Sequence, residues 1–148
     1  MRPSRKTSYG WRALFDLAFH SAGGAAQARE IAARQGIPLR YLEQILRDLR
    51  RAGMVDAKRG PGGGYALACP ARDLRLSRVF EVLDGAPSRP KRSGTTRPAP
   101  DVDVPEFFFR DVSTRFAAMC DGVTVQDMVD RAALLGLAQA PTTSMYFI

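Results

Sequence analysis

The sequence predicts a mainly α-helical fold with one small β-hairpin, namely a winged helix-turn-helix domain followed by a long dimerisation helix. Three observations carry this prediction: two short helical segments joined by a glycine-containing turn, a glycine-rich hairpin directly after them, and a separate aromatic helix further along the chain. The 148 residues suffice for one domain with an appendage. We expect the domain to span residues 1–85, a flexible linker 86–104, dimerisation helices 105–137 and a C-terminal tail 138–148.

The first domain is expected to contain three helices. Tyr9–Phe19 carries an apolar stripe before two glycines, and shorter helices are expected over Gln27–Gln35 and from Leu39 to about Ala52. Between the last two lies the turn Gly36-Ile37-Pro38, because glycine tolerates a positive φ and proline can open a helix but not continue one. This arrangement is typical of a helix-turn-helix.

The third helix divides into two faces. Leu42, Ile45, Leu46 and Leu49 share one face and are expected to pack inward. On the other face, arginine and glutamine can bond base edges bidentately, and glutamate can accept from cytosine. A solvated face would also be polar, but it would more often show Lys/Glu pairs four residues apart. We therefore interpret the second face as a DNA-reading surface made of Arg40, Glu43, Gln44, Arg47 and Arg51.

A β-hairpin is expected after the third helix. Met54–Ala57 and Tyr65–Ala68 can pair as strands, because the glycine-rich stretch between them allows a tight reversal. A nucleotide-binding glycine loop is the rival interpretation, but no Lys-Ser/Thr pair follows and the loop opens a strand rather than a helix. The hairpin is thus interpreted as a wing that contacts the DNA backbone or minor groove through Lys58, Arg59, Gly60, Gly62 and Gly63.

Ser77 can cap a short helix that runs through Leu83 and completes the first domain. Dimerisation is expected from residues 105–137, which include a further short helix over Thr124–Leu135. Between these two short helices a long helix carries a wide apolar stripe that it cannot bury alone, so pairing with a second copy is expected, with packing on its own domain as the alternative. The stripe consists of Phe108, Phe109, Val112, Phe116 and Met119.

Charge and composition narrow the function. The net charge is +7. Residues 1–84 hold 15 Lys/Arg against 8 Asp/Glu, whereas positive and negative charges are equal in number in the rest of the chain. This distribution is expected of a part that faces phosphates, or of a solvated basic face. The lack of a membrane-spanning apolar run or a secretory signal predicts a cytoplasmic protein with no membrane partner. Two cysteines cannot build a disulfide framework. With one histidine and no paired carboxylates or activated nucleophile, we expect neither an enzyme nor a metal site.

Two motifs at this spacing resemble the Rrf-two family of winged-helix regulators, the family of IscR, NsrR and CymR. They are Arg40-Tyr41-Leu42-Glu43-Gln44 and Arg59-Gly60-Pro61-Gly62-Gly63-Gly64-Tyr65, and the resemblance covers residues 1–85 closely and the long helix with Thr124–Val129 more loosely. It implies a homodimer on a palindromic double-stranded DNA operator, with base contacts from Glu43 and Gln44. Tyr41, inside the first motif, is placed with the DNA-contacting residues.

The chain departs from the family members that sense iron, nitric oxide or redox state. Those members hold an iron–sulfur cluster on three cysteines between the wing domain and the long helix, but residues 86–104 contain no cysteine here. No cofactor is therefore expected, and the chain resembles the clusterless CymR-like repressors of cysteine metabolism. Cys69 and Cys120 could be redox switches or inert core residues.

The last four residues, Met145, Tyr146, Phe147 and Ile148, resemble the isoleucine-ended peptide by which serine acetyltransferase docks into O-acetylserine sulfhydrylase (cysteine synthase). The resemblance implies a repressor of cysteine and sulfur-assimilation genes that is modulated by this enzyme. Three alternatives stay open: a tail that folds back on the dimer, a clusterless repressor that answers to another ligand or to thiol oxidation, and an interaction module that regulates cysteine synthase.

Overall fold

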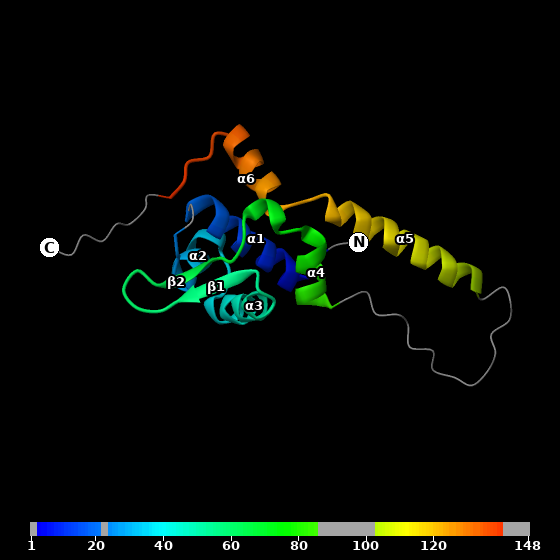
Figure 1. Ribbon diagram of the computed structural model, residues 1–148, viewed down its shortest axis with the longest axis horizontal. Helices are drawn as coiled ribbons and strands as arrows, with labels where there is room; N and C mark the ends of the chain where they lie inside the picture. The colour runs from blue at the N-terminus through cyan, green and yellow to red at the C-terminus, as the bar shows by residue number, and fades with distance from the viewer. Residues whose placement is uncertain (1–2, 22–23, 86–102, 141–148) are drawn as a thin grey trace.

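The computed structural model describes residues 3–21, 24–85 and 103–140, and these form a helical body with one hairpin and one projecting helix (Figure 1). The predicted mainly α fold with a hairpin is confirmed. Most of the expected linker and the tail residues Met145–Ile148 lie outside the described residues. The elements are α1 (Arg5–His20), α2 (Ala28–Gln35), α3 (Leu39–Arg51), β1 (Val55–Lys58), β2 (Gly64–Leu67), the 3-10 helix η1 (Ala71–Asp73), α4 (Leu76–Asp84), α5 (Asp103–Asp121) and α6 (Val125–Leu134).

Helix α1 forms the centre of the body, and α2, α3, α4, α6 and β2 all pack against it. It begins four residues before the predicted Tyr9, because the hydroxyl of Ser4 accepts a hydrogen bond from the amide of Thr7 at 3.1 Å and caps the first turn. Leu14 and Leu17 are buried in the core, and Gly10 lies where a Cβ would collide with Leu83 of α4. The end of the Leu83 side chain therefore packs directly over Gly10 and would have to move to admit a larger residue there.

The turn between α2 and α3 forms as the sequence indicates. Gly36 has a left-handed φ of 60°, and the amide of Ile37 donates to the carbonyl of Ala32 at 3.0 Å, which closes the end of α2. Pro38 then opens α3. All four predicted core residues of α3 are fully buried, and burial of each such side chain contributes about 1.5–3 kcal/mol. They are Leu42, Ile45, Leu46 and Leu49.

The hairpin is attached to the body through its backbone. β1 and β2 pair antiparallel with Val55 opposite Leu67 and Lys58 opposite Gly64, and the bounds of each strand lie within one residue of the predicted ones. Ala26, which precedes α2, exchanges two backbone hydrogen bonds with Tyr65, of 2.9 and 2.8 Å. Gly64 has a φ of 140°, and a Cβ there would collide with the carbonyl of Ala26. The hairpin can dock this closely only because residue 64 is glycine.

The predicted helix cap at Ser77 is wrong. Helix α4 begins at Leu76, and Ser77 is a helical residue whose hydroxyl donates to the Asp121 carboxylate at the end of α5. The cause is a tertiary contact, because the backbone of Arg75 is held extended by a bridge to Thr124. The amide of Leu76 donates to the carbonyl of Val123 at 2.8 Å, which fixes the start of the helix.

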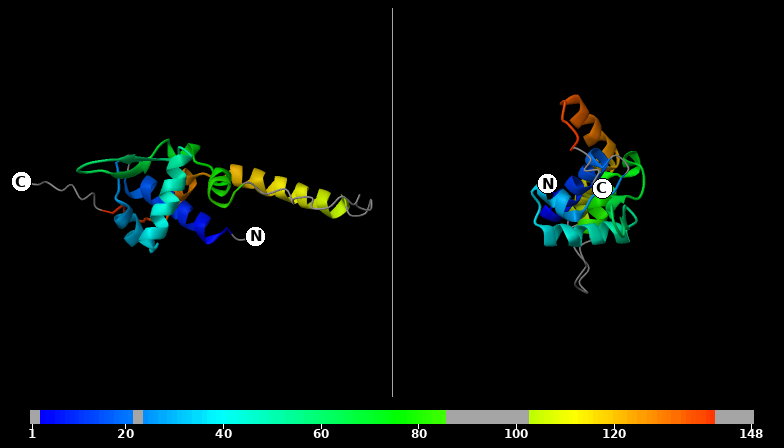
Figure 2. Two further views of the ribbon diagram at one scale, coloured as in Figure 1. Left: turned by 90° about the horizontal axis from the view of Figure 1, so that it is seen from below. Right: turned by 90° about the vertical axis from the view of Figure 1, so that its left-hand side faces the viewer.

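Helices α5 and α6 take different directions. α5 leaves the body and projects from it in Figure 1 and in the left view of Figure 2, whereas α6 packs on α1 and η1. Val125 and Ala132 of α6 are buried, and Val125 belongs to the main core. The expected grouping of both helices as one dimerisation unit thus differs from the packing, in which α6 completes the body. Among the described helices, none is long and apolar enough to cross a bilayer.

Candidate nucleic-acid interface

The polar face of α3 lies open on the surface of the body. Seen from below, α3 runs across the near side of the molecule (Figure 2, left). Its four buried apolar residues determine which side of the helix faces the core, so the residues of the opposite side point outward. Every residue predicted for DNA reading on this face is exposed: Arg40, Glu43, Gln44, Arg47 and Arg51.

One further cation lies on this face that was not among the predicted residues. Arg50 is exposed as well, and it follows Arg47 by three residues, a spacing that places both on the same side of a helix. Arg51 has a carboxylate neighbour, since its Nη1 lies 3.8 Å from Oδ1 of Asp48, but its side chain is 74% exposed. An exposed pair of this length holds the arginine weakly, so Arg51 can extend toward a phosphate.

Tyr41 lies at the edge of this face and not on it. Its ring is half-buried and packs edge-on against the ring of Tyr9 in α1, with centroids 5.7 Å apart and an interplanar angle of 74°. The ring therefore contributes to the contact between α1 and α3. A DNA contact from Tyr41 stays a prediction.

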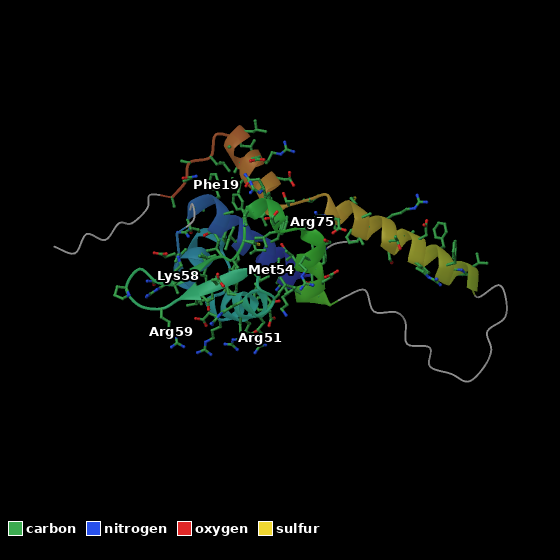
Figure 3. All side chains as sticks on the ribbon, in the orientation of Figure 1. Phe19, Arg51, Met54, Lys58, Arg59 and Arg75 are labelled. Atoms are coloured by element: carbon green, nitrogen blue, oxygen red, sulfur yellow. The ribbon has the colours of Figure 1, made fainter. Side chains whose placement is uncertain are left out.

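The wing places two more cations beside α3. Lys58 and Arg59 are exposed, and Arg51 and Arg59 both project toward the lower edge of the molecule in Figure 3, whereas Arg75 lies away from it. Gly60 and Gly62 have φ values of 91° and 72°, which L side chains rarely adopt. These glycines shape the loop.

Gly63 completes the turn. Its amide donates to the carbonyl of Gly60 at 2.9 Å, and a Cβ on Gly63 would collide with the carbonyl of Lys58. The loop backbone is therefore bare of side chains at three positions, and a second chain can approach it closely.

This geometry suits double-stranded DNA. An α-helix fits the major groove of B-DNA, which is about 12 Å wide, and a hairpin beside it can reach the neighbouring phosphates or the minor groove. Arginine and glutamine on the outer face of α3 supply the donors and acceptors that base edges recognise. Lys58 and Arg59 supply charge at a place where the backbone would run.

Replacing Lys58 and Arg59 by alanine is expected to weaken binding to every DNA sequence alike. Phosphate contacts carry no sequence information, and each cation lost should flatten the slope of log affinity against log salt by about one. Titrations of one duplex at several salt concentrations measure this slope. A slope that stays at its original value in the double variant would contradict the wing assignment.

The apolar stripe of α5 is largely exposed. The exposed fractions are 66% for Phe108, 70% for Phe109 and 62% for Met119, and Val112 is exposed at 43%. Phe116 differs, because its half-buried ring packs edge-on against Phe80 of α4 with centroids 5.7 Å apart.

Two further apolar side chains of α5, which were not part of the predicted stripe, are also exposed. Phe107 is exposed at 68% and Val104 at 67%. Phe107 was missed because it lies on the other side of the helix from the stripe, so helical spacing gave no reason to include it.

The two thiols do not fit an iron–sulfur cluster. Cys120 is buried at the end of α5, and Cys69 is half-buried beside a cavity that Leu17 and Val129 also line. Burial raises the pKa of both thiols, and Asp73 and Asp121 raise them further, so both stay protonated at neutral pH. A cluster needs three or four thiolates or comparable ligands, and the whole chain has two cysteines and one histidine.

Comparison with known proteins gives one family. The Rrf2 family, described as "Iron-dependent Transcriptional regulator", matches residues 3–131. The HTH-type transcriptional regulator IscR of Pectobacterium atrosepticum is 32% identical over 144 residues, which cover 97% of this chain and 88% of that protein.

Two solved structures are similar throughout. T. potens IscR has a TM-score of 0.76 and 32% identity, covering 95% of this chain and 94% of its own. CymR (YrzC), the global cysteine regulator of B. subtilis, has a TM-score of 0.72 and 26% identity, covering 88% of this chain and 98% of its own. The curated relative is an HTH-type transcriptional regulator, which confirms the expectation that the chain is not an enzyme. With a family match over most of its length and an exposed polar helix face beside a glycine-rich hairpin, the chain belongs to the Rrf2 family of winged-helix transcriptional regulators.

Proposed function

We propose that this regulator is a homodimeric repressor that binds a palindromic operator through α3 and the wing. The observation that carries the proposal is the exposed face of α3, in which Gln44, Arg47 and their neighbours stand free beside Lys58 and Arg59. A two-fold dimer presents two such faces, so its operator should consist of two half-sites in inverted orientation.

Dimerisation through α5 is supported by its exposed aromatic stripe. Phe108, Phe109 and Met119 form an apolar face that monomeric proteins rarely leave in water. Because α5 projects from the body, this face is accessible to the same helix of a second copy (Figure 2). Such a pairing would bury the stripes of both helices against one another.

For the regulated genes we propose cysteine supply and sulfur assimilation, with the protein acting in the cytoplasm. Two observations support this proposal: the likeness to CymR of B. subtilis, whose structure is titled as that of the global cysteine regulator, and the poor fit of the two cysteines to a cluster. Genomic DNA fragments retained by the purified protein should then be enriched in promoters of sulfur-assimilation genes and should share an inverted repeat. Enrichment of unrelated promoters would overturn the assignment of the genes and leave DNA binding intact.

The proposed modulator is O-acetylserine sulfhydrylase, bound by the tail Met145–Ile148. Deletion of Ile148 is expected to abolish binding to the enzyme and to leave DNA affinity unchanged. The deletion would shift the terminal carboxylate by about 3.5 Å and place Phe147 where the isoleucine side chain belongs. Binding of the enzyme to the intact and the shortened chain can be compared by calorimetry.

Peptides provide the control for this experiment. A synthetic peptide that ends in Met-Tyr-Phe-Ile should compete with O-acetylserine for the enzyme, whereas its amidated form should not, because the carboxylate is seated on backbone amides. Equal inhibition by both peptides, or retention of the enzyme by the shortened chain, would refute the docking proposal.

The alternative function, an interaction module that binds DNA incidentally, makes a different prediction. Its DNA binding would appear only at micromolar concentrations and would show no sequence preference. Thiol oxidation is the other alternative, and the raised pKa of Cys69 and Cys120 disfavours it, because the thiolate is the reactive form.

A further inference from the structure

One face of α1 contacts both helices of the helix-turn-helix through four side chains. Lys6, Tyr9, Arg12 and Asp16 follow one another at spacings of three, three and four residues, which places them in a row along the helix. Each of them contacts α2 or α3 directly or through a neighbour in the row. We call this row the α1 clamp.

At one end of the clamp, Asp16 holds the last turn of α2. Its carboxylate is fully buried and accepts hydrogen bonds from Arg34, at 2.7 Å from Nη2 and 3.0 Å from Nε, and from Nε2 of Gln35 at 2.9 Å. The bond to Asp16 raises the pKa of Arg34. A buried carboxylate that loses such partners is strongly destabilised, so the end of α2 cannot shift freely along α1.

The middle of the clamp joins α2 to α3. Nη2 of Arg12 donates to the main-chain carbonyl of Gln35, the last residue of α2. The guanidinium of Arg12 also lies over the ring of Tyr9, 5.6 Å from its centroid, and Tyr9 meets Tyr41 in the first turn of α3 edge-on. Three contacts in series thus connect the end of one helix with the start of the next.

The far end of the clamp holds the second half of α3. Nζ of Lys6 lies 2.8 Å from Oδ2 of Asp48, on the side of α3 that faces α1. The helix is therefore fixed to α1 at two places, near Tyr41 and at Asp48, which are two turns apart. Two contacts at this separation restrict the tilt of α3 relative to α1 more than one contact would.

We propose that the α1 clamp determines sequence discrimination without touching DNA, by fixing the angle of α3 relative to α2. The inference rests on the DNA-reading role of α3. Hydrogen bonds to base edges need side chains held within about 0.5 Å of their correct places, whereas phosphate contacts tolerate a shifted helix. A loosened clamp should therefore weaken binding to the preferred sequence and spare binding to other sequences.

The test compares two DNA duplexes of equal length. One is selected from a randomised pool by the unmodified protein, and the other is a scrambled version of it. Arg12→Met, Tyr9→Leu and Asp16→Asn should each lower the ratio of the two affinities by about tenfold, which is the discrimination carried by one base contact. The net charge changes by −1, 0 and +1 in these variants, so a shared loss cannot arise from charge.

Two matched variants separate the clamp from general stability. Tyr9→Phe keeps the ring and should retain the full ratio of affinities. Phe15→Leu alters the same helix on another side, where Phe15 stacks on Phe19 at 5.3 Å, and should lower the melting temperature without changing the ratio. All measurements are made well below the lowest melting temperature, and if Asp16→Asn fails to fold, Arg12→Met and Tyr9→Leu decide the matter.

The outcomes are distinct. A lower ratio in the clamp variants with intact binding to scrambled DNA supports the clamp. An unchanged ratio, whether both affinities stay the same or fall by the same factor, overturns the clamp and leaves the DNA-reading role of α3 in place. If the unmodified protein selects no preferred sequence, both the DNA-reading function and the clamp are overturned.

Discussion

Replacing Phe108 and Phe109 by glutamate is expected to convert the dimer into monomers and to lower operator affinity by about 100-fold or more, since one half-site alone retains few contacts. The two rings are among the most exposed apolar side chains of α5, and carboxylates at both positions would place four negative charges in the paired interface. Sedimentation velocity measures the mass of the particle in solution. Phe116 is left unchanged, because its replacement would also remove the contact with Phe80 and disturb the body.

The control for this variant is Thr114→Glu. Thr114 is exposed on α5 but lies on the side of the helix away from the stripe, so the substitution should leave the dimer intact. Neither change touches the core of the body, so circular dichroism should show a folded protein in both cases. A double variant that still sediments as a dimer would refute the α5 interface.

Replacing Gln44 or Arg47 by alanine is expected to reduce affinity for the operator strongly and for random DNA only slightly. Each base contact contributes about 1–3 kcal/mol, and a dimer loses the contact at both half-sites, so the total is about 2–6 kcal/mol. The preference for one or two base pairs in each half-site should relax at the same time. A binding assay with single-base variants of the operator measures both effects.

Arg75→Ala is the matched control for Arg47→Ala. It removes the same charge from an exposed side chain that lies away from α3 (Figure 3), so its effect should be small on all sequences. An equal loss of affinity on operator and random DNA in Arg47→Ala would instead assign this arginine to a phosphate.

The parts of the fold that local sequence signals specify could be predicted. Helices α1 to α3 follow from apolar periodicity. The turn and the hairpin follow from glycines, which adopt backbone conformations that other residues avoid. The start of α4 could not be predicted, because it is set by the backbone bridge between Arg75 and Thr124, which are far apart in the chain. The packing of α6 on α1 likewise joins segments that are far apart in the chain.

The candidate site shows the same division. Helical spacing identifies the outer face of α3, and it would have identified Arg50 as well. It cannot separate Tyr41 from that face, because only the position of Tyr9 shows where the ring packs. The contacts of Asp16 with Arg34 and Gln35 join two helices, and no pattern within either segment predicts them.

The docking of the wing has a consequence for protein engineering. The hairpin is held on the body by main-chain bonds between Ala26 and Tyr65, and its turn closes through the amide of Gly63. Neither contact uses a side chain of the tip, and the side chains of Arg59 and Pro61 are exposed. The tip is therefore a modular element: residues 59 and 61 can be exchanged to change what the wing touches, while Gly63 and Gly64 must be kept because a Cβ at either position would collide with backbone.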